Sequence, residues 1–232
     1  MQNMKNFKNE RLLVIAPHAD DEVLGCGGLI SRVKNDGGQV FVLIFNVGSI
    51  VKTNNKKFTE LWKKETSEAM KFLKVDKYET VYETPEDNRY LDTKPLHSLI
   101  SKIETDTSIS LVKTNPTIVA IPTIHSHHQD HVHVFKACIA ALRPLSKPIA
   151  NTVISYEAPE HSKWSVSGVF EPNFYVNIDD YLGKKINAFY KYKSQVRTGG
   201  RDKNTIKNQA YYRGREVGQK ACEAFYLHRF LI

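Results

Sequence analysis

The sequence is poor in cysteine and lacks any long apolar run. Its three cysteines, Cys26, Cys138 and Cys222, stand far apart without a Cys-x-x-Cys pair, as expected in a reducing compartment, so we expect a cytoplasmic protein. The apolar runs 12–16 and 40–45 are far shorter than the roughly 20 residues that a membrane-spanning helix needs. Residues 1–10 are polar, without the apolar core of an export signal. We therefore expect neither a membrane span nor export.

The chain also lacks a Ser/Pro-rich linker, an internal repeat and a low-complexity segment. Hydrophobic residues make up 41% and charged residues 25% of the 232, which is ordinary for a globular protein. We therefore expect a single domain over residues 1–232, in which residues 150–232 complete the wall of the site. The sequence leaves the oligomeric state open, a homo-oligomer included.

Apolar runs alternate with segments of helical spacing. Residues 11–16 form a continuous apolar run, which is typical of a parallel strand buried on both faces. Further strands are expected at 39–46, 79–82, 117–122, 153–156 and 174–178. Helices are expected at 20–36, 58–74, 95–105, 132–142, 181–195 and 204–225. This alternation predicts an α/β fold with a mostly parallel sheet and helices on both faces.

Two clusters of metal-binding side chains follow predicted strands. The first, at residues 17–22, reads Pro-His-Ala-Asp-Asp-Glu, and the second, at 125–133, holds five of the nine histidines. In parallel sheets ligands bind at the carboxyl ends of strands, so both clusters are expected at one edge. Imidazole and carboxylate together suit zinc, iron or manganese. Each cluster alone has a simpler interpretation, a helix cap or a surface histidine tract, but their coincidence favours a metal site.

The spacing within the clusters suggests metal-assisted hydrolysis. His18 and Asp21, three residues apart where a turn opens into a helix, can face one point, and one histidine of the second cluster would complete the site. Asp20 would remain free to act as a general base on water. A further imidazole, three residues before the third ligand, would face the developing oxyanion.

These motifs carry a family resemblance. Pro-His-Ala-Asp-Asp-Glu-Val-Leu-Gly-Cys-Gly-Gly from residue 17, together with His-Gln-Asp-His from residue 128, resembles the PIG-L/LmbE-like zinc-dependent N-deacetylases. That family removes acetyl from N-acetylglucosamine carrying varied aglycones. The resemblance implies a Rossmann-like three-layer fold with the zinc at the carboxyl ends of the strands. Later segments, such as Ser155-Tyr-Glu157 and Glu223-Ala-Phe225, resemble one bacterial subgroup.

The resemblance also implies roles for individual residues. His18, Asp21 and His131 match the zinc ligands, with iron or manganese as alternative metals, and Asp20 matches the general base. His128 matches the histidine that stabilises the tetrahedral intermediate.

Asp130 would then orient His128. Two positions depart from the family pattern: Ala19 stands where proline is common, and Ser126 where aspartate is frequent. The alanine should loosen the turn without removing a ligand. Ser126 puts in doubt a contact that supports the ligands.

Substrate contacts are less sharply indicated. Asp87 and Arg89 are candidates to bind sugar hydroxyls or a phosphate, against the alternative of a charged turn. Trp164 is a candidate to stack on a sugar face, or else to pack in the core. The histidines at 125, 127 and 133 receive no role from the sequence.

The net charge of +8 leaves several partners open. Many basic residues of 184–215 are interleaved with tyrosine, a pattern found in nucleic-acid-binding surfaces and, more often, in solvated helix faces. No helix-turn-helix, zinc finger or RNA-recognition signature supports nucleic-acid binding, and we do not expect it. The leading prediction is an N-deacetylase of an amino-sugar conjugate, with an anionic conjugate favoured by the charge. The alternatives are a metal-dependent hydrolase of another bond, such as a phosphoester, and a nucleic-acid-binding module.

Overall fold

The computed structural model describes residues 6–47, 56–84, 90–144, 150–159, 164–165 and 168–232. Within these ranges it contains seven strands of one sheet: β1 (Arg11–His18), β2 (Gln39–Asn46), β3 (Lys77–Tyr82), β4 (Ile118–Pro122), β5 (Thr152–Tyr156), β6 (Phe174–Asn177) and β7 (Cys222–Phe230). The α-helices are α1 (Asp21–Asn35), α2 (Lys56–Leu73), α3 (Leu96–Ser101), α4 (Leu111–Thr114), α5 (Gln129–Ala141), α6 (Leu182–Phe189) and α7 (Lys203–Arg215). Short 3₁₀ helices span Leu91–Thr93 and Lys193–Gln195, and one π turn spans Lys102–Asp106.

The strand order is β3-β2-β1-β4-β5-β7-β6. The first five of these strands run parallel to one another, while β7 is antiparallel to both β5 and β6. This mixed but mostly parallel sheet confirms the α/β fold that the sequence predicts.

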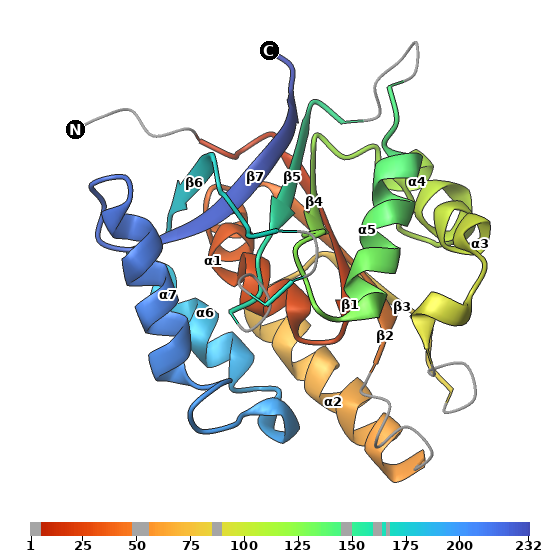
Figure 1. Ribbon diagram of the computed structural model, residues 1–232, viewed down its shortest axis with the longest axis horizontal. Helices are drawn as coiled ribbons and strands as arrows, with labels where there is room; N and C mark the ends of the chain where they lie inside the picture. Colours follow the sequence, from red (N-terminus) through yellow and green to blue (C-terminus); the bar gives the residue numbers. More distant parts are fainter. Residues whose placement is uncertain (1–5, 48–55, 85–89, 145–149, 160–163, 166–167) are drawn as a thin grey trace.

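Both faces of the sheet are covered, which makes three layers (Figure 1). Alternate residues of β1 enter opposite cores: Leu12 and Val14 face α1 and α6, whereas Leu13 and Ile15 face α3 and α5. Because successive side chains of a strand point to opposite faces, a strand buried on both sides must be apolar throughout. That requirement explains the continuous apolar run at the start of the chain.

The helix expected over residues 204–225 is wrong in its second half. α7 ends at Arg215, Gly218 adopts a positive φ of 68°, and the chain returns as the strand β7. The residues around Cys222 have no strong local preference for a strand. Pairing with β5 on one side and β6 on the other decides their conformation, because tertiary contacts override weak propensity. The helix expected over 181–195 is also shorter, since α6 ends at Phe189.

A close packing of helix on sheet brings the start of α1 to the carboxyl edge. Tyr156, at the end of β5, is buried and its hydroxyl donates to the carbonyl of Ile15 at 2.9 Å. A Cβ at Gly25 of α1 would lie 2.1 Å from the Tyr156 ring, so this approach requires glycine.

Within the described ranges, no helix is long and apolar enough to cross a lipid bilayer.

Candidate metal and catalytic site

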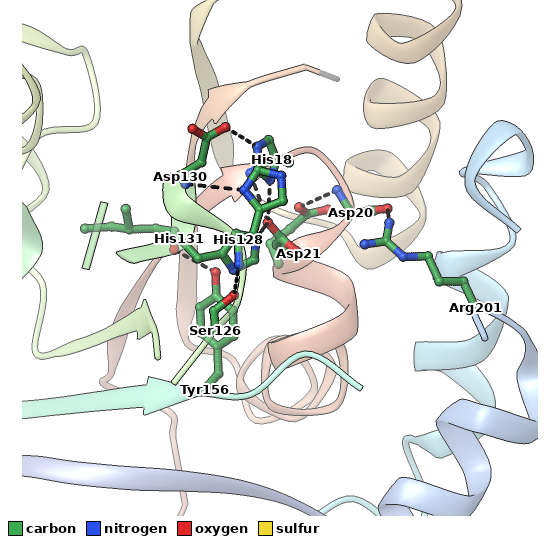
Figure 2. Close-up of polar contacts among 11 residues, drawn as sticks. His18, Asp20, Asp21, Ser126, His128, Asp130, His131, Tyr156 and Arg201 are labelled. Carbon is green, nitrogen blue, oxygen red and sulfur yellow. Dashed lines mark hydrogen bonds and ion pairs between the residues drawn. The ribbon is translucent and has the colours of Figure 1, made fainter. Parts of the chain in front are cut away.

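Three segments bring the acidic and histidine side chains together at the carboxyl edge of the sheet (Figure 2). His18 is the last residue of β1, and Asp21 is the first residue of α1. His131 lies in the first turn of α5, which follows β4. Because β1 and β4 are parallel neighbours, the segments after them meet at the same edge.

Asp21 is the centre of this cluster. Its Oδ2 lies 3.2 Å from Nε2 of His131 and 3.4 Å from Nδ1 of His18. Its Oδ1 is buried and has no hydrogen-bond partner among the described residues. One nitrogen or oxygen atom from each of these three residues lies within 4.8 Å of the others, close enough to hold one metal ion.

The donor set fits a divalent metal. Two imidazoles and one carboxylate match the three protein ligands of catalytic zinc sites, and a buried carboxylate oxygen without a partner is a site for a cation. Burial by itself would raise the pKa of Asp21, but His131 and His18 lower it well below its usual value. Asp21 is therefore ionised at neutral pH, as a ligand must be.

Asp130 contacts a different histidine from the one expected. Its carboxylate Oδ2 lies 2.8 Å from Nε2 of His18, and its Oδ1 accepts from the backbone N–H of Asp92 at 3.3 Å. Burial would lower the pKa of His18, but the hydrogen bonds to Asp130 and Asp21 raise it to about 9. Metal-binding histidines commonly use their second nitrogen to bind a carboxylate in this way. The side chain of Asp130 thus orients His18.

His128 is held by backbone groups. It caps α5, and its Nδ1 accepts from the backbone N–H of Asp130 at 3.3 Å. Its own backbone N–H donates to Oγ of Ser126 at 3.1 Å. Ser126, which stands where aspartate is frequent, therefore still helps to hold His128. Burial first, and then the charges of His18 and His131, lower the pKa of His128 to about 4. His128 is therefore neutral at pH 7, with its proton on Nε2.

Sequence reasoning missed Arg201. Its Nη1 lies 2.6 Å from Oδ2 of Asp20. The Asp20 residue is 2% exposed, and its backbone has a positive φ of 109°. Arg201 belongs to the loop before α7, about 180 residues away in the chain. The density of basic residues there was visible, but no local pattern distinguishes this arginine from the others.

Other basic residues of 184–215 also contact carboxylates inside the protein, so they are not available to a nucleic acid. Like Arg201 with Asp20, two further ion pairs have both side chains largely buried: Lys185 with Glu223, and Arg213 with Glu157. These pairs account for part of the basic pattern without nucleic acid.

The remaining sequence candidates lie apart from the cluster or outside the described residues. Asp87 and Arg89 lie outside the described residues. Trp164 is 78% exposed, so it does not pack in the core. Nε2 of His133 lies 2.9 Å from the carbonyl oxygen of Lys94, so this nitrogen is engaged with the backbone and not with the cluster.

The fold and this cluster define an α/β protein of Rossmann-like architecture with an acidic and histidine-rich site at the carboxyl ends of its parallel strands. A family model described as PIG-L, GlcNAc-PI de-N-acetylase, matches residues 13–142, which is more than half of the chain. The chain belongs to the PIG-L family. Over 193 residues it is 27% identical to the "uncharacterized deacetylase YaiS" of Escherichia coli strain K12, covering 81% of this chain and 92% of that relative.

Solved structures share the fold over nearly the whole chain. The conserved protein TT1542 of Thermus thermophilus has a TM-score of 0.74 and 25% identity, with 96% of each chain covered. The N,N′-diacetylchitobiose deacetylase of Pyrococcus horikoshii has a TM-score of 0.70 and 20% identity, covering 97% of this chain and 86% of its own. GalB, the 4-carboxy-2-hydroxymuconate hydratase of Pseudomonas putida KT2440, has a TM-score of 0.73 and 18% identity, covering 96% and 98%. Since a hydratase shares this fold, the reaction must be argued from the site.

Proposed function

We propose that this protein is a metal-dependent N-deacetylase that hydrolyses the acetamide of an N-acetylglucosamine-type sugar or glycoconjugate. The observation that carries the proposal is the convergence of His18, Asp21 and His131, with Asp20 and His128 beside them, in a chain of the PIG-L family. The metal we propose is zinc, with iron or manganese as alternatives, held by His18, Asp21 and His131. When bound, such an ion polarises a carbonyl group and makes water more acidic.

The side chains around that site divide the remaining work. Asp20, adjacent to a ligand but directed to Arg201, accepts the proton of the attacking water as that water adds to the acetamide carbon. Neutral His128 donates from Nε2 to the oxygen that becomes negative in the tetrahedral intermediate. The carbon-nitrogen bond then breaks, and Asp20 returns the proton to the leaving amine, which gives acetate and the free amino sugar.

The wider setting follows from the chain as a whole. We propose that residues 1–232 act as one domain, since Asp20 comes from the first part of the chain and its partner Arg201 from the last. All three cysteines are free and buried, which supports a reducing, cytoplasmic location. The substrate is proposed to be a small amino-sugar conjugate.

The test is acetate release from N-acetylglucosamine glycosides before chelation, after chelation and after zinc is restored. We expect activity to disappear with the metal and to return with it. Asp20→Asn should keep the metal yet lose about 10²–10⁴-fold in kcat, because it removes the general base. His131→Ala should lose both metal and activity, while His97→Ala, an exposed histidine of α3, should retain both. Acetate release that survives chelation and the His131→Ala change would refute the proposal.

A further inference from the structure

A cavity of about 320 Å³ lies between the sheet and α5, and its lining includes His125 from the segment that leads to His128. Its described lining comes from the segment after β4, from α5, from β5 and from β7: Thr123, Ile124, His125, Phe135, Ser155, Tyr226 and His228. A volume of this size lies at the lower end of the range for small-molecule sites. It can accommodate one ring of a small ligand.

A β-bulge shapes one wall of the cavity. The register between β5 and β7 shifts between Val153 and Ile154, where β7 carries His228 as an extra residue. The bulge places Nε2 of His228 2.6 Å from Oγ of Ser155 and its ring 4.9 Å from that of Tyr226. Bulges of this kind often re-aim side chains next to functional sites.

The wall therefore combines aromatic faces with hydrogen-bonding groups. Tyr226 is 42% exposed, and the ring of Phe135 lies 5.9 Å from that of His228. A half-exposed aromatic ring offers a negative face on which the weakly positive C–H groups of a sugar ring can stack. Ser155 and His228, which are hydrogen-bonded to each other, add polar groups to the same wall.

The part of the lining that the structure describes carries no fixed charge. The seven described residues include no Asp, Glu, Lys or Arg, and burial lowers the pKa of His228, so that it is neutral at pH 7. A buried anion would need a cation or several donors to offset its lost hydration. The sequence favours an anionic conjugate, but this cavity suits an uncharged, hydroxylated ring.

The cavity also adjoins the catalytic residues along the chain. His125 precedes His128 by three residues, and its buried Nδ1 has no hydrogen-bond partner among the described residues. A Cβ at Gly168 would lie 3.8 Å from the His125 ring, so Gly168 lies against one residue of the cavity wall. His125 thus offers a buried polar atom, without a partner among the described residues, and it lines the cavity three residues before His128.

We propose that this cavity is the subsite for the aglycone of the substrate, and that it binds an uncharged hydroxylated ring stacked on Tyr226. The inference rests on the proposed deacetylase function, because it assumes that the acetamide lies at His128 while the rest of the conjugate extends past His125. It assigns roles to His125, Ser155, Tyr226 and His228.

The experiment compares three substrates by acetate release: methyl N-acetylglucosaminide, a disaccharide of N-acetylglucosamine with glucose, and N-acetylglucosamine 1-phosphate. The disaccharide should have the highest kcat/KM of the three. Tyr226→Ala should reduce kcat/KM about tenfold for the disaccharide, through KM, because an aromatic contact of this kind is lost. The same variant should reduce kcat/KM for the methyl glycoside by a smaller factor, because that substrate lacks the second ring, and Tyr226→Phe should restore most of the kcat/KM for the disaccharide because it keeps the aromatic face.

Tyr78→Ala is the matched control, because Tyr78 is 37% exposed on β3, which lies away from β7 across the sheet. Equal losses for all three substrates, or no loss with the disaccharide, would overturn the subsite while leaving the deacetylase proposal intact. Absence of acetate release from every substrate would instead refute the deacetylase. Saturation-transfer NMR with the disaccharide then tests the cavity by itself, and binding that Tyr226→Ala does not weaken refutes it. A change of oligomeric state in Tyr226→Ala, measured by light scattering, would identify a subunit interface and overturn the proposal.

Discussion

Removal of the Glu223 carboxylate should destabilise the protein strongly. Glu223, on β7, accepts from the backbone N–H groups of Gly28 and Leu29 of α1 at 2.7 Å each, and from Nζ of Lys185 of α6 at 2.7 Å. Both charged residues are 4% exposed. One carboxylate therefore joins a strand to two helices, including the helix that begins at Asp21.

The expected magnitude follows from this burial. In Glu223→Ala the ammonium of Lys185 remains buried without its partner, and breaking a buried pair from one side costs about 3–5 kcal/mol. At about 2–4 °C per kcal/mol for a chain of this size, the Tm should fall by about 6–20 °C. Urea denaturation followed by circular dichroism measures the free energy of unfolding directly.

Two further variants separate this explanation from a general sensitivity to mutation. Glu60→Ala removes a carboxylate that lies 3.7 Å from Lys63 on the exposed surface of α2, where its side chain is 63% exposed, and it should cost at most about 0.5 kcal/mol. Replacement of both buried charges, Lys185→Met with Glu223→Leu, should recover much of the loss, because no buried charge is then left unpaired. If Glu223→Ala costs no more than Glu60→Ala, the reasoning is refuted.

Two predictions concern the site itself. Asp130 and Asp21 raise the pKa of His18 to about 9, so His18 is protonated in the metal-free protein at pH 7. A histidine must be neutral to bind a metal ion. Metal binding should therefore release about one proton at pH 7 and progressively less as the pH rises through 9. Calorimetry in buffers of different ionisation enthalpy measures this release, and none at pH 7 would contradict the assignment of His18. Arg201→Ala should lower kcat about 10–100-fold with the metal retained, because a charged hydrogen bond to buried Asp20 is lost, and Arg201→Lys should recover part of the rate. Unchanged kcat in Arg201→Ala would show that Asp20 does not need this arginine.

The sequence by itself determined the local features of this protein. A strand buried on both faces requires a continuous apolar run, so β1 could be predicted from the order of its residues alone. The clusters at residues 17–22 and 125–133 each lie within one short segment at the end of a strand or just after it. Parallel strands share a carboxyl edge, and their meeting could therefore be expected before the structure was known.

Only the tertiary structure decided the features that depend on distant parts of the chain. β7 is a strand because β5 and β6 pair with it, although its residues are also compatible with a helix. Asp20 meets Arg201 because the loop before α7 returns to the start of α1. The carboxylate of Asp130 reaches His18, across the cluster, while its backbone meets nearby His128. Periodicity and motif spacing report contacts within a few residues, whereas these contacts depend on how complete elements pack, and for that reason no local pattern contains them.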